Sequence, residues 1–333
     1  MKEKLKRLAP KLGYPLFYLV CLVVFASWVM PYHRLKERIV AQFNALQKPG
    51  AGAQELSIDE VTSSWLTGIK ATGIKLLVAP GDSTKPPAEL RVDEAKVRVS
   101  LLSALVGNRS VSFTVSAWDG KIEGSYAERS KDREVDVEIK NLELGQAEAL
   151  GAMLSLPLEG RLSGTVRLAM AEGKASKGSG AVALDIEGAA VGKGKDFELA
   201  LGKMGKLSLP RLNLGSLSLQ AEAKEGILRV NKLAASGKDV ELSGEGRIQM
   251  RELATDSIAD VNLTLKVADS YKTKNDKTKS IFGEPGKGGG LLDFDPKVKS
   301  MKKADGSYAV RLTGPLSNLG TMPGSLLPPS PSK

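Results

Sequence analysis

The chain has few of the side chains from which catalytic and metal sites are usually built. Its 333 residues include one cysteine and one histidine. A lone cysteine cannot form an internal disulfide, and one cysteine with one histidine is too few for the Cys and His ligands from which zinc sites are built. Cys21 lies inside a long apolar run and His33 directly follows that run, so neither is placed for a Ser-His-Asp or Cys-His arrangement. The composition predicts a binding or structural protein that is not an enzyme and needs no cofactor or metal.

Aromatic residues are also scarce, at 5% of the chain, whereas glycines number 35. Proteins that bind single-stranded nucleic acid stack bases on aromatic side chains, so this composition argues against nucleic acid as a partner. The net charge is +10, but five of the basic residues and only one acidic residue lie in the first eleven positions. The rest of the chain is therefore only mildly basic.

One long run, residues 12–32, contains no charged residue. As a helix it would be about 31 Å long, enough to cross a hydrocarbon core of about 30 Å. The basic residues 1–11 precede it, and the positive-inside rule keeps such a segment in the cytoplasm. A cleaved signal peptide is the alternative, with Val24-Phe25-Ala26 as a weak cleavage site. Because the apolar run continues past that site, we expect an uncleaved single-pass anchor, with the bulk of the chain across the membrane.

Residues 33–48 follow the run and have helical periodicity. Leu35, Ile39, Phe43 and Leu46 form one apolar stripe, and Lys48-Pro49-Gly50 ends it. Two interpretations are open: a stalk that contacts a partner helix or the membrane surface, or a helix that packs on the following domain. The second is favoured, because a stripe of four residues is typical of an ordinary surface helix.

Residues 54–267 change to a period of two, which is typical of strands with one apolar face. The run from Leu158 to Leu168 and the run from Val240 to Met250 both alternate apolar or glycine residues with polar ones. Asp119-Gly120 and the segment Lys224–Gly226 are typical of tight hairpin turns. We expect a large, mostly antiparallel β domain with one or two short helices.

The end of the chain is less regular. Residues 268–304 are rich in lysine and glycine and are predicted to be a flexible insertion. Residues 305–319 contain a final strand, and the proline-rich residues 320–333 are predicted to be a disordered tail. Asp293 and Asp295 form the one carboxylate pair in the insertion, and solvated loop residues are the favoured interpretation.

A sheet of this length has one apolar face that something must cover. Either the sheet closes into a sandwich or barrel, or it curls into a trough whose lining is left for a ligand. The trough is slightly favoured, since few aromatic residues are available to fill a thick core. The alternation predicts these residues as the lining of a trough: Leu162, Val166, Leu219, Val240, Leu242, Ile248, Leu263 and Leu265.

Two segments, Leu228–Met250 and Tyr308–Gly324, carry a family resemblance. With the N-terminal run and the glycine-punctuated strands, they resemble the N component of the bacterial type II secretion system in its non-enteric form. The chain is also similar to the wider AsmA-like group, whose members are curved antiparallel sheets that carry phospholipid along an apolar groove.

The resemblance implies a protein of the Gram-negative inner membrane with a periplasmic domain. Its implied function is that of an accessory or scaffold component of type II secretion, with other inner-membrane subunits of that system as partners. The alternative it implies is phospholipid binding or transfer in the cell envelope. The family has no catalytic residues to transfer to this chain.

Overall fold

The computed structural model describes residues 29–46, 54–65, 67–78, 88–147, 157–192, 196–200, 206–284, 289–316 and 320–323, with residues 14, 17, 18, 21, 22, 24, 25 and 194. Ten of the 21 residues of the predicted span 12–32, and the whole of the tail 324–333, lie outside these residues. Within the part of the chain that is described, no helix combines the length and the apolar character needed to cross a membrane.

One antiparallel sheet of fourteen strands makes up most of the described chain, in the order β1 to β8 and then β11 to β16. Each strand pairs with the strands before and after it in this order, so the sheet is a simple meander. The expectation of a mostly β, antiparallel protein is thereby confirmed. Its strands are β1 (Gln54–Ser64), β2 (Gly68–Val78), β3 (Ala88–Val99), β4 (Arg109–Ala117), β5 (Gly120–Arg129), β6 (Asp132–Glu143), β7 (Leu158–Met170), β8 (Gly178–Val191), β11 (Leu212–Lys224), β12 (Ile227–Ser236), β13 (Val240–Gln249), β14 (Ile258–Val267), β15 (Tyr308–Pro315) and β16 (Gly320–Pro323).

Two hairpin turns show how the local sequence sets the register. Glu225 and Gly226 have φ angles of 51° and 74°, as a type I′ turn requires, and join Lys224 to Ile227. The turn between β4 and β5 differs from the expectation by one position. Trp118 and Asp119 adopt the positive φ angles, while Gly120 already pairs with Ala117 as the first residue of β5.

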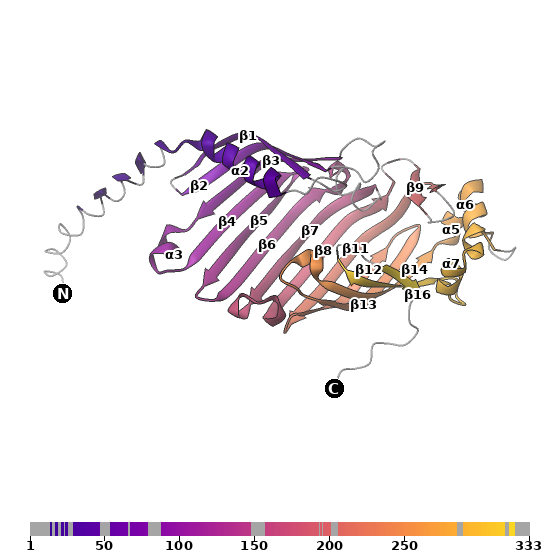
Figure 1. Cartoon of the computed structure of the whole chain (residues 1–333). Coiled ribbons are helices and arrows are strands. Elements are labelled where there is room, and N and C mark those ends of the chain that lie inside the picture. Colours follow the sequence, from indigo (N-terminus) through magenta and orange to yellow (C-terminus); the bar gives the residue numbers. More distant parts are fainter. Residues whose placement is uncertain are drawn as a thin grey trace.

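The sheet twists and curls along its length. In Figure 1 strands β12–β16 cross the direction of strands β4–β8. A right-handed twist between successive strands accumulates in any sheet of this width. The smaller elements lie at the ends of the sheet or in its turns: α2 (Tyr32–Leu46), α3 (Leu101–Leu105), η1 (Leu144–Gln146), η2 (Ala171–Gly173), η3 (Ala175–Lys177), the hairpin of β9 (Phe197–Ala200) and β10 (Lys206–Leu209), η5 (Ala254–Asp256), α5 (Asp269–Lys272), α6 (Asp276–Phe282), η6 (Leu291–Phe294) and α7 (Pro296–Met301).

Helix α2 packs on the edge strand β1 and does not stand free as a stalk. The Asn44 amide donates to the carbonyl of Leu56 at 3.3 Å and accepts from its N–H at 2.8 Å. Lys36 Nζ donates to the carbonyl of Asp59 at 2.9 Å. Because an exposed strand edge invites pairing with other chains, these contacts also cover the edge of the sheet.

The insertion 268–304 differs most from its prediction, because much of it is helical and packed. Tyr271, Ile281 and Met301 are buried, which a flexible segment would not be. Helix α6 begins with a capping box in which Asn275 Oδ1 accepts from the N–H of Thr278 at 2.8 Å. The lysine and glycine content of the insertion concealed these few apolar anchors.

The two other assignments at this end also change. Asp295 is the N-cap of α7, and its carboxylate accepts from the N–H of Lys297 at 2.8 Å. Asp293 accepts from Lys302 Nζ at 2.7 Å. Strand β16 (Gly320–Pro323) pairs with β15 within the segment that was predicted to be a disordered tail.

Candidate functional site

The register of the sheet gathers the apolar side chains on one face. Three parallel rows cross eleven strands, from β3 to β15, and every position in them is apolar or glycine. Two of the rows run from Val97 to Leu312 and from Val99 to Gly314. The other row consists of Ala95, Val115, Ile122, Ile139, Gly164, Leu184, Leu219, Leu233, Gly244, Leu263 and Val310. We call the surface made by these rows the apolar face.

The eight residues predicted from the alternation all lie on this face. Leu219, Leu263, Val166 and Ile248 belong to the three rows. A shorter fourth row contains Leu162, Leu242 and Leu265. Val240 lies beyond that row and is only 1% exposed, in a cluster with Val267 and Tyr271. Val240 is therefore covered, whereas the other seven remain partly exposed.

Sequence reasoning missed the part of the apolar face that lies on β3 to β6. Val97, Phe113, Tyr126 and Val137 continue the rows there. The alternation that places them in strands was visible in the sequence. Which strands share a face depends on their pairing, however, and a period of two does not record the pairing.

The middle of the apolar face is only partly covered. Leu219, Leu233 and Leu263 each keep part of their surface exposed. The described helices contact the sheet elsewhere, with α2 on β1, α3 on β4, and α7 on β15 and β16, while α6 contacts β10 of the small hairpin. Side chains on the inside of a curl converge and shield one another, which accounts for Ala221 and Val230 being buried within the rows. We infer that the apolar face lines the concave side of the sheet.

Glycines on this face make room for larger neighbours. A Cβ atom at Gly124 would come within 2.5 Å of Phe113 Cζ, and a Cβ atom at Gly244 within 2.5 Å of Leu263 Cδ2. Phe113 and Leu263 therefore lie across the neighbouring glycine. The surface of the rows is therefore more even, because a large side chain fills the space left by the glycine on the next strand.

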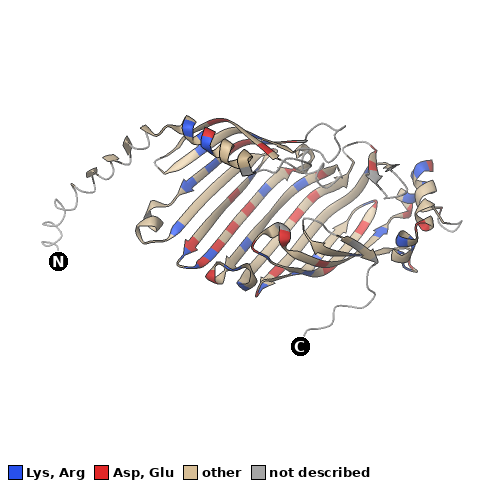
Figure 2. Ribbon diagram, in the orientation of Figure 1, with Lys and Arg blue, Asp and Glu red and all other residues tan. Residues whose placement is uncertain are grey.

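The opposite face of the sheet carries ion pairs. Lys140 Nζ lies 2.9 Å from Glu123 and 3.1 Å from Glu138. Lys121 and Lys140 together lower the pKa of Glu123 to about 2. Charged residues recur along the strands of the sheet (Figure 2). The register places Lys121, Glu123, Glu138 and Lys140 on the face away from the three rows, whereas the Arg109–Glu128 pair lies on the same side as the rows, beyond them at the ends of β4 and β5. The sheet thus has one wet face and one apolar face.

One end of the apolar face is closed by the hairpin β9–β10 and helices α5 to α7. Val191, Phe197, Leu209 and Ile281 form a buried cluster there. The Tyr271 hydroxyl donates to the carbonyl of Pro210 at 2.5 Å, and burial raises the pKa of that tyrosine. We call this assembly the cap.

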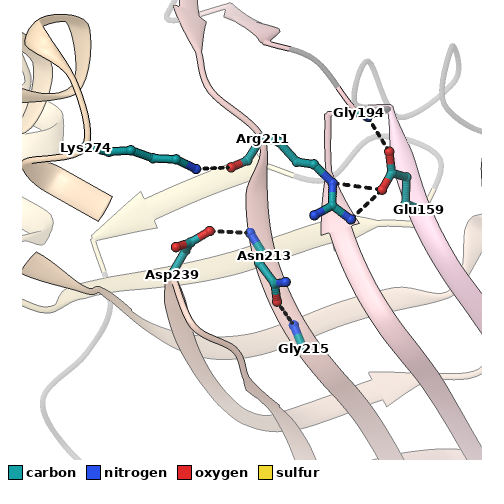
Figure 3. A network of polar contacts seen from close by, with 7 residues as sticks. All are labelled: Glu159, Gly194, Arg211, Asn213, Gly215, Asp239 and Lys274. Atoms are coloured by element: carbon teal, nitrogen blue, oxygen red, sulfur yellow. Dashed lines mark hydrogen bonds and ion pairs between the residues drawn. The ribbon is translucent and has the colours of Figure 1, made fainter. Parts of the chain in front are cut away.

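A polar network ties the cap to the sheet (Figure 3). Arg211 donates from Nε and Nη2 to Glu159 Oε2 at 2.9 and 2.6 Å, and Glu159 Oε1 accepts from the N–H of Gly194 at 2.6 Å. Lys274 Nζ donates to the carbonyl of Arg211 at 3.2 Å. Strand β7, the start of β11 and the insertion are thereby fixed together. The cap is held rigidly at one end of the apolar face.

A pocket of about 370 Å³ lies near this network and is lined by Glu143, Glu159, Gly160, Arg161, Glu187 and Gly188. Its carboxylates do not gather into a metal site: within the described residues, no group of three or more His, Cys, Asp or Glu side chains could hold a metal ion. The apolar face is therefore the strongest candidate for a functional site.

Comparisons with family models, curated protein sequences and solved structures found no match to this chain.

Proposed function

We propose that the chain is a membrane-anchored protein of the cell envelope that binds phospholipid by its acyl chains along the apolar face. The observation that carries this proposal is the continuity of the three rows, which cross eleven strands without one charged residue. An apolar surface of that extent that remains partly exposed to water is typical of a site that binds an apolar ligand or partner.

The dimensions suit acyl chains. Eleven strands spaced about 4.8 Å apart give rows about 48 Å long, and three alternate positions along a strand span about 13 Å. An acyl chain covers about half of a hydrocarbon core, or about 15 Å. Several chains would fit along the rows, and transfer of their methylene groups from water onto the rows is favourable. The ion-paired face would stay in water.

The membrane location is part of the same proposal. The described side chains of the N-terminal run are exposed, with Phe17 at 64%, Leu22 at 66% and Phe25 at 65%. Exposed aromatic and aliphatic side chains on a run without charge favour a lipid environment. We place the run in the inner membrane as a single span, with the basic N-terminus in the cytoplasm and the sheet in the periplasm.

A role in type II secretion is a second proposal. The two resembling segments, Leu228–Met250 and Tyr308–Gly324, contain β12, β13, β15 and β16, which lie together around β14. One end of the sheet, β12 to β16, thus contains these two segments. If this end binds subunits of the secretion system in the same membrane, the full-length chain will co-purify with them, and a failure to recover any would remove this role.

Lipid binding is best tested at single positions, because a membrane anchor itself retains lipid during purification. We expect a photo-crosslinking amino acid at Leu242 to label phospholipid in cells, and the same group at Ser243 to label little. Leu242 faces the apolar side and the adjacent Ser243 is exposed on the opposite side. Equal labelling at the two positions would contradict the proposal.

A charge at the same pair of positions provides a second readout. Leu242→Asp should reduce bound lipid several-fold, and Ser243→Asp, which adds the same charge to the other face, should not. Urea unfolding of both variants separates lost binding from a lost fold.

A further inference from the structure

The strand ends opposite the cap carry exposed apolar side chains at two turns, the one between β1 and β2 and the one between β3 and β4. Trp65, in the turn between β1 and β2, is 79% exposed. In and just after α3, between β3 and β4, Leu105 and Val106 are 77% and 71% exposed. The N–H of Val99 donates to the carbonyl of Thr67 at 3.2 Å, so the two turns are neighbours. We call this surface, with Leu101, the apolar tip.

The N-terminal run leaves the sheet at the same end. Helix α2 runs antiparallel to β1, since Asn44 contacts Leu56 whereas Lys36, earlier in the helix, contacts Asp59, later in the strand. The start of α2 therefore points toward Ser64 and the turn that holds Trp65. In Figure 1 the start of α2 and helix α3 lie on the same side of the molecule.

The charge around the apolar tip suits a phospholipid surface. Residues 61–75 and 95–118, which include the two turns, most of β2 and all of β4, contain five Lys or Arg and no Asp or Glu. Lys70 and Lys96 pair with Glu94, which belongs to β3. Arg98 and Arg109 are exposed, and Arg109 lies 3.7 Å from Glu128 of β5. Basic side chains beside apolar ones attract anionic headgroups, and tryptophan favours the interfacial region of a bilayer.

We propose that the apolar tip docks into the phospholipid leaflet from which the N-terminal run emerges. This inference rests on the membrane anchor of the proposed function. Leu101, Leu105, Val106 and Trp65 enter the headgroup region, while Arg98 and Arg109 meet anionic lipid. Val99 is both the neighbour of α3 and the first residue of one of the three rows. Docking therefore joins the leaflet to the start of the apolar face, so that an acyl chain meets apolar surface from the bilayer onward.

The test uses the full chain in vesicles of phosphatidylethanolamine and phosphatidylglycerol, with one environment-sensitive fluorophore per variant. Native Cys21 reports on the anchor. In a Cys21→Ser background, Leu105→Cys reports on the tip and Phe294→Cys is the control, since Phe294 is 79% exposed in the cap at the other end of the sheet. We expect labels at 21 and 105 to shift to shorter emission wavelengths and to be quenched by spin-labelled lipid, and the label at 294 to behave as in water.

The outcomes distinguish the two proposals. A label in lipid at 21 with a label in water at 105 would overturn the docking of the tip and leave the anchor intact. Water-like emission at 21 would overturn the anchor, and docking would then stand only if the label at 105 were still quenched. As a second measurement, Arg98→Gln with Arg109→Gln should reduce quenching at 105 in anionic vesicles, and replacing phosphatidylglycerol with a neutral lipid should do the same for the parent chain.

Discussion

Gly124 is the position at which the apolar face depends most directly on a missing side chain. A Cβ atom there would lie 2.5 Å from Phe113 Cζ and 2.8 Å from the carbonyl oxygen of Asp136. The backbone oxygen cannot move without breaking the pairing of β5 with β6. We expect Gly124→Ala to lower the free energy of unfolding by about 1 to 3 kcal/mol, as overpacking does.

Urea unfolding followed by circular dichroism measures this effect. Gly145→Ala is the matched control, because the nearest atom to a Cβ there is Glu143 Oε1 at 3.7 Å. Its effect should stay within about 0.5 kcal/mol. Equal effects of the two substitutions would mean that Phe113 does not occupy the space over Gly124.

The ion pairs of the wet face make a contribution that depends on pH. Arg311 donates from Nε and Nη2 to Asp260 at 2.7 and 3.0 Å, and Arg247 lies 3.6 Å away. Chiefly through the hydrogen bonds from Arg311, the pKa of Asp260 is lowered from its ordinary value. A carboxyl whose pKa is lower in the folded state stabilises the fold above its unfolded pKa, and this stabilisation is lost as the pH falls through the folded value.

We therefore expect Asp260→Asn to destabilise the protein at pH 7 and to have a diminishing effect as the pH falls below about 4. Urea unfolding of both proteins across this range measures the difference. Glu245→Gln controls for the loss of one negative charge, because Glu245 is an exposed carboxylate of β13 on the same face of the sheet as Asp260 of β14. A destabilisation by Asp260→Asn that is constant with pH would show that the loss of packing, and not the ion pair, is responsible.

At the scale of the elements, the side-chain amide of Asn44 is a main contact through which α2 protects the edge of the sheet. Asn44 imitates a neighbouring strand by both donating to and accepting from Leu56. Asn44→Ala should cost about 1 to 2 kcal/mol. It should also speed hydrogen exchange at the Leu56 N–H, because the edge of β1 is then open to water.

Hydrogen exchange measured by NMR or by mass spectrometry of peptides from β1 tests this. Gln42→Ala is the control, since Gln42 is exposed on the same helix. If both variants leave exchange at Leu56 unchanged, α2 is not what covers this edge.

The elements also show which parts of the fold could be predicted. Strict alternation, as from Val240 to Gln249, identifies a strand and its apolar side from the sequence alone, because successive side chains point to opposite faces. The insertion could not be predicted in this way. Its apolar anchors Tyr271, Ile281 and Met301 are ten and twenty residues apart and fit neither a strand nor one helix. Ile281 becomes part of a core only against Phe197 of β9 and Leu209 of β10. Tyr271 does so only against Val240 of β13 and Val267 of β14. Met301 is buried in α7, which contacts β15 and β16.

The candidate site shows the same division. Seven of the eight predicted lining residues lie on the apolar side of the sheet and keep part of their surface exposed. Each was predicted from the alternation of apolar and polar residues in its own strand. Val240 is covered by the cap, and nothing in its local sequence indicates the tyrosine that packs on it. The apolar tip was not predicted, since five helical residues between two strands give no periodic signal.

At the scale of the whole molecule, the meander makes every strand depend mainly on its two neighbours. Chains built in this way tend to unfold from their ends, as repeat proteins do, because most contacts of a strand are with its two neighbours. The two ends differ here. Strand β1 is covered by α2, whereas β16 has four residues and includes Pro323. The cap adds buried contacts to β11, β13 and β14.

We therefore expect hydrogen exchange in low urea to be fastest in β16 and slowest near β8 to β14. Exchange in β1 should be slower than in an uncovered edge strand, because α2 packs on it. Bound phospholipid should slow exchange in β4 to β6, which do not contact the cap among the described residues, more than in β13 and β14, which contact it. Exchange measured by mass spectrometry on lipid-loaded and delipidated protein provides the comparison. Uniform exchange across all strands would mean that the sheet unfolds as one unit. A lipid effect confined to the capped end would place the ligand near the cap and away from the open rows.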